Sequence, residues 1–126
     1  MEITGKVYSG LGEGAFFTSL DWVQQQSEKM LGFRPYPGTL NVQIQEQQVA
    51  SMQNYLKGIE GKLFQAPSEN FCNAVCYPVF LQSKFMGALI LPEKTVHPPH
   101  YLEIISPVML KKELALKDGD EIIIKL

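Results

Sequence analysis

Apolar and polar residues alternate along several short stretches of this chain, which is the pattern of half-buried β-strands. The clearest stretch is residues 40–44, in which Leu, Val and Ile alternate with Asn and Gln. Similar short runs between turn residues predict further strands at residues 3–8, 15–18, 74–81, 85–91, 101–105 and 121–126. Residues 82–84 then form a hairpin loop between the two longest of these strands.

Two segments show the apolar spacing of amphipathic helices instead. The first begins near Asp21, which can cap it together with Gln24 three residues on, and Gly32 stands at its C-terminal end. The second covers residues 46–57 and ends at Gly58. Many short strands with few short helices predict a mostly β fold, a small barrel wrapped by helices, in one domain without repeat or linker.

Composition and charge narrow the class of protein. The 126 residues carry a net charge of -2 with a pI of about 5.6, whereas a protein that binds nucleic acid by neutralising phosphates has a basic face. No apolar run reaches the roughly 18 residues of a membrane span, and no signal peptide is recognisable. Cys72 and Cys76 are too few for a disulfide scaffold. We therefore expect a cytoplasmic protein with neither nucleic-acid nor membrane partners.

Residues 9–14, Ser-Gly-Leu-Gly-Glu-Gly, form a glycine segment that is the first candidate for chemistry. Three glycines within five residues predict a tight loop rather than the interior of a helix or strand. Successive backbone N–H groups in such a loop can form a nest for phosphate oxygens. A glycine-rich turn without any ligand is an equally good interpretation, because the pattern is neither a P-loop nor a dinucleotide-binding motif.

Thr39 and Asn41 are the second candidate. Residues two apart on a strand face the same way, so their side-chain oxygens would converge on one spot. Mg²⁺ takes oxygen ligands and often shares its coordination shell with substrate phosphates and water. On spacing alone, the simpler interpretation is that both side chains bind neighbouring backbone at the start of the strand.

A third candidate is a helix predicted to open at Ser106, with Pro107 in its first turn. The free N–H groups of residues 108–110 could bind an anion at the helix start, and Lys111 or Lys112 could add positive charge. An ordinary capped surface helix with solvated lysines explains the same pattern.

The fourth candidate is the segment 95–103, which contains a hydroxyl, two imidazoles and a carboxylate. His97 and His100 alone do not predict zinc, because zinc sites usually take three or four protein ligands. Glu103 could accept a hydrogen bond from a hydroxyl substrate or deprotonate it. A glutamate between apolar strand residues could equally face water.

Taken together and in order, these motifs resemble the archaeal family of CTP-dependent riboflavin kinases. The matching segments are residues 9–14, 31–33, 35–41, 92–97, 102–105, 107–110 and 116–120. Each motif is common by itself, but their order along nearly the whole chain is specific. The middle of the chain, from about residue 45 to residue 73, resembles the family least.

The resemblance implies a small six-stranded cradle-loop β-barrel and one kinase domain over residues 1–126, without an N-terminal DNA-binding domain. It implies transfer of the γ-phosphoryl group of CTP to the 5′-hydroxyl of riboflavin, giving FMN and CDP, with Mg²⁺ as cofactor, by a monomer. Two other interpretations stay open. One is a non-catalytic barrel that binds flavin or nucleotide, and the other is a DNA-binding barrel of the swapped-hairpin type.

The resemblance also assigns roles to particular residues. It places the nucleotide against Leu11, Gly12, Glu13, Gly14, Ala15, Phe16, Val108, Met109, Leu110 and Lys111. It implies Mg²⁺ at Thr39 and Asn41, riboflavin at Thr95 and Glu103, and a catalytic role for Glu103 at the hydroxyl. Lys111 stands where the family pattern leads us to expect arginine, so a bidentate phosphate contact becomes a point charge.

Overall fold

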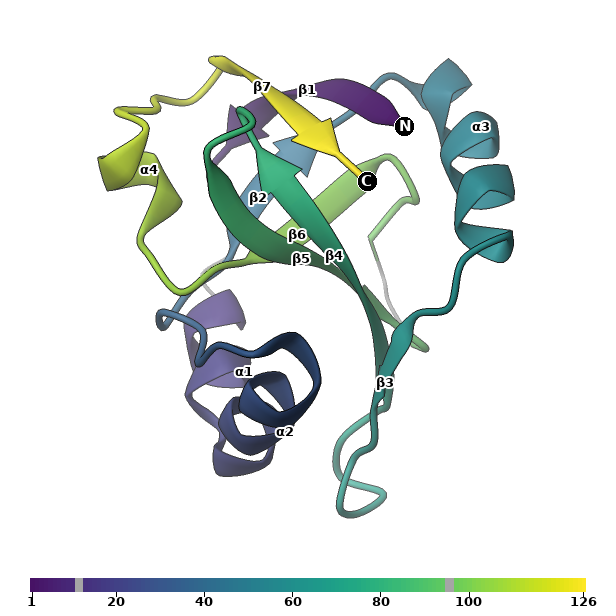
Figure 1. The fold of residues 1–126 in the computed structure, drawn as a ribbon, viewed down its shortest axis with the longest axis vertical. Coiled ribbons are helices and arrows are strands. Elements are labelled where there is room, and N and C mark those ends of the chain that lie inside the picture. The colour runs from purple at the N-terminus through teal and green to yellow at the C-terminus, as the bar shows by residue number, and fades with distance from the viewer. Residues whose placement is uncertain (11–12, 95–96) are drawn as a thin grey trace.

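The computed structural model describes residues 1–10, 13–94 and 97–126. Its strands are β1 (Glu2–Tyr8), β2 (Leu40–Gln43), β3 (Lys62–Phe64), β4 (Ala74–Leu81), β5 (Phe85–Pro92), β6 (Tyr101–Ile105) and β7 (Glu121–Lys125). Its helices are α1 (Glu13–Ser19), α2 (Asp21–Leu31), α3 (Glu46–Lys57) and α4 (Leu110–Glu113) (Figure 1).

Six antiparallel strands form a closed barrel in the order β4-β5-β6-β2-β1-β7, and β7 pairs back with β4 (Figure 1). The closing contact is short, since only Phe80 with Lys125 and Leu81 with Ile124 are in register. β3 pairs with the other half of β4. The predicted mostly β fold with a six-stranded barrel is therefore confirmed.

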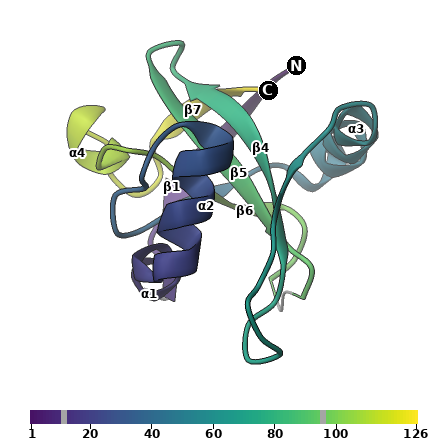
Figure 2. The same cartoon turned by 60° about the horizontal axis from the view of Figure 1, so that its bottom comes forward.

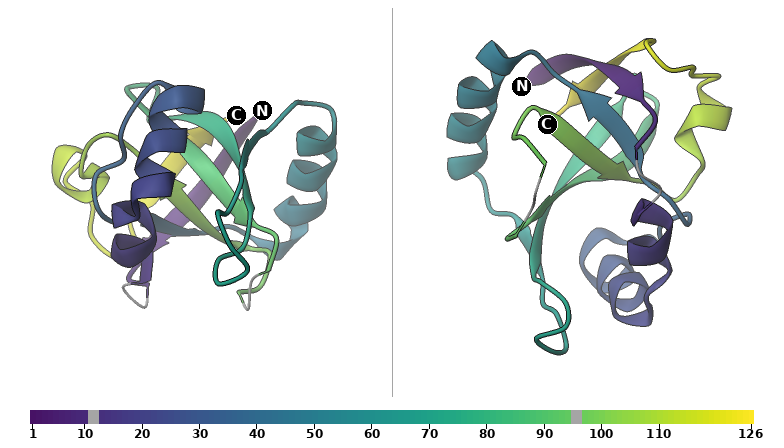
Figure 3. Two further views of the ribbon diagram at one scale, coloured as in Figure 1. Left: turned by 90° about the horizontal axis from the view of Figure 1, so that it is seen from below. Right: turned by 180° about the vertical axis from the view of Figure 1, so that it is seen from behind.

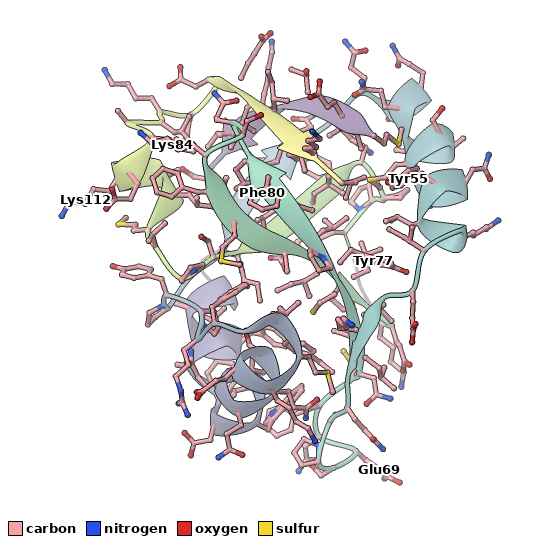
Figure 4. All side chains as sticks on the ribbon, viewed as in Figure 1. Tyr55, Glu69, Tyr77, Phe80, Lys84 and Lys112 are labelled. Atoms are coloured by element: carbon pink, nitrogen blue, oxygen red, sulfur yellow. The ribbon has the colours of Figure 1, made fainter. Side chains whose placement is uncertain are left out.

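The barrel is filled by side chains from alternate positions of its strands, as the sequence pattern predicts. In β1, Ile3 and Val7 are buried while the residues beside them face outward or lie half-buried. In β4, Val79 and Leu81 are buried, whereas Phe80 between them is 53% exposed and points outward in Figure 4. In these two strands buried and exposed residues alternate, whereas residues 87–90 of β5 are all buried.

Two hydrophobic clusters hold the helices against the barrel. Val23 of α2 belongs to one cluster together with Ile90 of β5 and Ile105 of β6. Met52 and Leu56 of α3 belong to the main core inside the strands. The α1–α2 pair and α3 consequently lie on different sides of the barrel (Figures 2 and 3). No helix in the described part of the chain is long and apolar enough to cross a membrane.

The prediction of a strand at residues 15–18 is wrong, because these residues belong to α1. Thr18 is buried, and its hydroxyl donates to the Gly14 carbonyl oxygen (2.7 Å), four residues earlier on the helix. The phenylalanines and the threonine of this segment favour strand by themselves, but packing against α2 overrides that preference. Gly14 therefore lies in a helix and not in a loop.

Helix α2 begins at Asp21 as predicted, but the predicted capping box is wrong. Leu20 is the N-cap residue and its side chain makes no capping hydrogen bond. Gln24 reaches across the chain instead, donating to the carbonyl oxygens of Thr18 (2.5 Å) and Pro35 (2.9 Å). The C-terminal prediction is confirmed, since Gly32 has a φ of 82° and donates to carbonyls of the last turn.

The predicted helix start at Ser106 and Pro107 is also wrong, because α4 spans only Leu110–Glu113. The Ser106 hydroxyl donates to the Met86 carbonyl oxygen on β5 (2.8 Å) and accepts weakly from the Val108 N–H (3.4 Å). Ser106 therefore ties the end of β6 to β5 rather than capping a helix. The remaining predicted strands and the helix at 46–57 agree with the structure to within a residue.

Candidate functional site

A cavity of about 520 Å³, here called the main cavity, opens between β1, β2, β6 and the first turn of α1. Its lining residues are Tyr8, Ser9, Gly10, Gly14, Ala15, Gly38, Thr39, Asn41, His97, Pro98, Tyr101 and Glu103. The cavity thus joins the two predicted metal ligands, the predicted riboflavin-binding glutamate and part of the glycine segment. Its size lies in the range of small-molecule sites.

Three neighbouring strands contribute one row of polar side chains to the main cavity. Asn41 on β2 stands directly opposite Tyr8 on β1 and Glu103 on β6. Residues directly opposite each other in an antiparallel pair project from the same face of the sheet. A phenol, an amide and a carboxylate therefore lie side by side, and Thr39 joins them from the residue before β2.

Glycines at two positions allow the glycine segment to approach these polar side chains. A Cβ on Gly10 would collide with the Asn41 amide group, and one on Gly14 would collide with the Thr39 hydroxyl. Neither position has a positive φ, so close approach is the reason for glycine there. The segment and the Thr39–Asn41 pair therefore form one unit.

Helix α1 also fixes the connector that leads into β2. The Thr18 hydroxyl accepts a hydrogen bond from the Gly38 N–H (2.7 Å), and Thr18 is fully buried. Gln24 holds the Pro35 carbonyl, and the Tyr36 N–H donates to the Ser106 carbonyl (2.8 Å). These bonds determine where the chain enters β2, and so where Thr39 points.

Tyr8 and Tyr101 form an aromatic corner in the main cavity that the sequence reasoning missed. Their rings meet edge to face with centroids 5.2 Å apart. Burial, with the charge of Glu103 and the neighbouring Tyr101, raises the pKa of Tyr8, so its phenol stays protonated and can donate a hydrogen bond. A signal was present, because Tyr101 precedes Glu103 by two residues on the same strand face.

A smaller cavity of about 100 Å³, here called the side cavity, lies on the other side of Thr39. Its lining residues are Tyr36, Pro37, Gly38, Thr39, Leu40, Ile104, Ser106, Val108, Met109, Leu110 and Lys111. The two cavities share Gly38 and Thr39. The predicted nucleotide-contacting residues 108–111 therefore border the same residues as the glycine segment, although they do not open a helix as predicted.

The two lysines of α4 differ in direction. The Lys111 ammonium donates to the Asp118 carboxylate (Nζ to Oδ1, 3.1 Å) and borders the side cavity. Lys112 points away from the molecule (Figure 4). Of the two lysines that the sequence offered, the structure therefore places only Lys111 at the site.

Asp118 links the two halves of this region. The Ser9 hydroxyl donates to its other oxygen (2.6 Å), and the hydrogen bonds from Ser9 and Lys111 lower the pKa of the Asp118 carboxyl. The carboxylate thus bridges the start of the glycine segment and α4. Residues 116–120 matched the family pattern, but no sequence pattern predicted that Asp118 contacts Ser9 and Lys111.

The remaining predicted site residues lie partly at the main cavity and partly outside it. Ala15 borders the main cavity, whereas the Phe16 side chain is 65% exposed and lines neither cavity. Glu13 is the first residue of α1. The predictions for Leu11, Gly12 and Thr95 fall outside the described residues.

The donor set of the main cavity suits a hard cation. Thr39 and Asn41 supply neutral oxygens, and Glu103 lies beside Asn41. Among the described residues, no group of three or more His, Cys, Asp or Glu side chains could hold a metal. Oxygen donors that leave room for phosphate and water fit Mg²⁺ better than zinc.

Comparison with known proteins identifies the family of the chain. A family model named CTP-dep_RFKase, described as a domain of unknown function (DUF120), matches residues 7–126. Proteins named riboflavin kinase are similar to this chain. The one from Methanocella arvoryzae is 41% identical over 97% of this chain and 55% of its own length. The one from Methanosarcina barkeri is 39% identical over 100% and 56%.

A third riboflavin kinase, from Sulfurisphaera tokodaii, is 38% identical over 100% of this chain and 95% of its own length. The chain thus spans little more than half of the first two relatives and nearly all of the third. The chain belongs to the family of CTP-dependent riboflavin kinase domains.

Proposed function

We propose that this protein is a riboflavin kinase that transfers the γ-phosphoryl group of CTP to the 5′-hydroxyl of riboflavin, giving FMN and CDP. The observation that carries the proposal is the main cavity, in which Thr39, Asn41 and Glu103 meet the glycine segment. A phosphoryl transfer needs its two substrates held in line with the charge of the phosphates neutralised. The family to which the chain belongs supports the identity of both substrates.

In this proposal the nucleotide lies between the glycine segment and residues 108–111, with its phosphates near Thr39. Gly10 and Gly14 let the backbone approach, and Lys111 contributes a positive charge from the side cavity. Thr39 and Asn41 would hold Mg²⁺, which neutralises phosphate charge when bound. Because α4 has only four residues, its dipole adds little, and single N–H groups and Lys111 carry the binding.

Riboflavin would occupy the part of the main cavity nearest β6. Glu103 would accept a hydrogen bond from the 5′-hydroxyl and orient its oxygen toward the phosphoryl group, which is the role of a general base or positioning carboxylate. Because Glu103 stands directly opposite Asn41, a hydroxyl bound by Glu103 would lie close to phosphates bound at Asn41. Tyr8 and Tyr101 give the main cavity an aromatic lining, which suits a planar ring such as the flavin.

The test is incubation with riboflavin, Mg²⁺ and either CTP, UTP, GTP or ATP, with FMN measured by chromatography. We expect FMN with CTP and much less with the other nucleotides. If no nucleotide yields FMN, the kinase proposal is wrong. If the protein then still binds flavin or CTP, it is the non-catalytic barrel. If ATP yields FMN and CTP does not, the protein is a riboflavin kinase but the proposed phosphoryl donor is wrong.

A further inference from the structure

The turn before β7 places one carboxylate between two segments of the proposed nucleotide site. The Asp118 carboxylate accepts from the Ser9 hydroxyl at 2.6 Å and from the Lys111 ammonium at 3.1 Å. Ser9 belongs to the glycine segment and lines the main cavity, whereas Lys111 lines the side cavity.

The backbone around Asp118 is held firmly against β1. The Gly119 N–H donates to the Val7 carbonyl (2.7 Å), and the Val7 N–H donates to the Asp120 carbonyl (2.9 Å). The Asp120 carboxylate accepts from the Lys117 N–H (2.8 Å), which closes the turn. Asp118 therefore projects from a fixed base, unlike a carboxylate on a flexible loop.

Lys111 needs such a fixed partner more than an arginine would. Its ammonium is a point charge on a flexible four-carbon stem, whereas a guanidinium is a planar and pre-organised fork. An ammonium has three N–H donors, so one bond to Asp118 leaves donors for a phosphate oxygen. The bond to Asp118 therefore restricts where the charge lies without using up its capacity to bind.

The pair is too exposed to matter much for the stability of the fold. The side chains of Lys111 and Asp118 are 35% and 54% exposed, and such surface ion pairs contribute little to the free energy of unfolding. Asp118 can therefore be changed while the barrel stays intact. Any effect of the change on binding then reports on the site.

We infer that Asp118 is a positioning residue of the nucleotide site, which holds the Lys111 ammonium and the Ser9 hydroxyl in place before the phosphates bind. This inference rests on the proposed function, since it assumes that Lys111 meets the nucleotide. The opposite role is physically possible, because a carboxylate beside a polyphosphate repels it. The two roles predict opposite changes in affinity, so an experiment can separate them.

The test compares Asp118→Asn with wild type in CTP binding by calorimetry with Mg²⁺ and in the kinetics of FMN formation. We expect the Kd and the KM for CTP to rise on the order of 3- to 10-fold, the range of one partly exposed charged hydrogen bond. The kcat, the KM for riboflavin and the melting temperature should change little. Glu113→Gln removes the same charge from the helix that carries Lys111, and it should leave all of these values unchanged.

A double-mutant cycle identifies the partner. In a Lys111→Ala background, Asp118→Asn should lower CTP affinity by clearly less than in wild type, because only the Ser9 contact is left to lose. Tighter CTP binding by Asp118→Asn, unchanged binding, or an equal loss in the Lys111→Ala background would each overturn the inference. FMN formation by wild type in the same series tests the kinase proposal separately. If wild type neither binds CTP nor makes FMN, the proposed function fails and this inference falls with it.

Discussion

At Gly14, helix propensity favours alanine, whereas the close approach to Thr39 requires glycine. Gly14 lies inside α1, where alanine would favour the helix by about 1 kcal/mol over glycine. A Cβ at this position would, however, occupy the place of the Thr39 hydroxyl. The glycine is therefore explained by the site and not by the helix.

We expect Gly14→Ala to displace Thr39 and to lower the rate of FMN formation at subsaturating Mg²⁺ by roughly tenfold, since a misplaced positioning group has effects of that order or larger. Kinetics at several Mg²⁺ concentrations measure this. Gly58→Ala is the matched control, because an added Cβ there makes only an ordinary contact of 3.5 Å. Full activity of Gly14→Ala would show that the close approach to Thr39 is unimportant.

Asn41→Ala tests the proposed metal ligand. Loss of its amide oxygen should raise the Mg²⁺ concentration needed for half-maximal FMN formation and weaken binding of Mg²⁺ with CTP. Gln43→Ala on the same strand, outside the main cavity, should leave both values unchanged. An unaltered Mg²⁺ dependence in Asn41→Ala would contradict the assignment.

The two cysteines should differ in reactivity for a physical reason. Burial raises the pKa of the Cys76 thiol to about 12, so the thiol stays neutral and unreactive in the folded protein. The ordinary thiol pKa is about 8.5, so the stability that neutral Cys76 contributes is complete below that pH and is lost as the pH rises towards 12. Mass spectrometry after iodoacetamide at pH 8 should find Cys72 modified and Cys76 modified only on unfolding. Equal labelling of both would contradict this.

At the scale of elements, α1 and the connector into β2 act as one unit through Thr18. Its hydroxyl donates to the Gly14 carbonyl and accepts from the Gly38 N–H, which joins the helix to the residue before Thr39. Sequence patterns could not show this bond, because its two ends are 20 residues apart. The same contact helps to make residues 15–18 helical rather than extended.

We expect Thr18→Val to lower the free energy of unfolding by about 0.5–1.5 kcal/mol, because the half-buried Gly38 N–H loses its hydrogen-bond partner. It should also weaken CTP binding, since Thr39 loses its anchor. Denaturant unfolding and calorimetry measure the two effects. Thr18→Ser keeps the hydroxyl and should restore CTP binding; if it binds as weakly as Thr18→Val, the hydrogen bond is not the cause.

An element was predicted correctly where its pattern is local, and wrongly where a hydrogen bond to a distant segment decides the structure. The β4–β5 hairpin follows from two apolar runs separated by turn residues, and α3 follows from helical spacing. Both agree with the structure. The predicted helix start at Ser106 failed because its hydroxyl binds Met86, 20 residues away. A serine hydroxyl can cap a helix, but it can also bind other backbone groups, so a good capping sequence does not by itself predict a helix start.

At the scale of the whole molecule, the barrel depends on a short closing contact between β4 and β7. Gln82 extends it, because its backbone N–H donates to the Ile123 carbonyl (3.0 Å) and its side-chain oxygen accepts from the Ile123 N–H (2.9 Å). The site lies on β1, β2 and β6, so it depends on this closure only indirectly, through β7 pairing with β1.

Ile124 is buried at this closure, and Ile124→Ala should lower the free energy of unfolding by about 2–5 kcal/mol, as for other buried aliphatic side chains. Below its melting temperature the variant should keep the KM of wild type for riboflavin, since no site residue is changed. Ile123→Ala is the control, because Ile123 is exposed. Equal stability of the two variants would show that the closing contact contributes little.

The sequence by itself determined the strands of the barrel, the ends of α2 and α3, and the residue types of the site. These follow from alternation, spacing and chemistry within a few residues of one another. The tertiary structure alone decided that α1 is a helix, that Tyr8 stands beside Asn41, and that Asp118 meets Ser9 and Lys111. Strand register and contacts between distant segments set these features, and no local pattern encodes them.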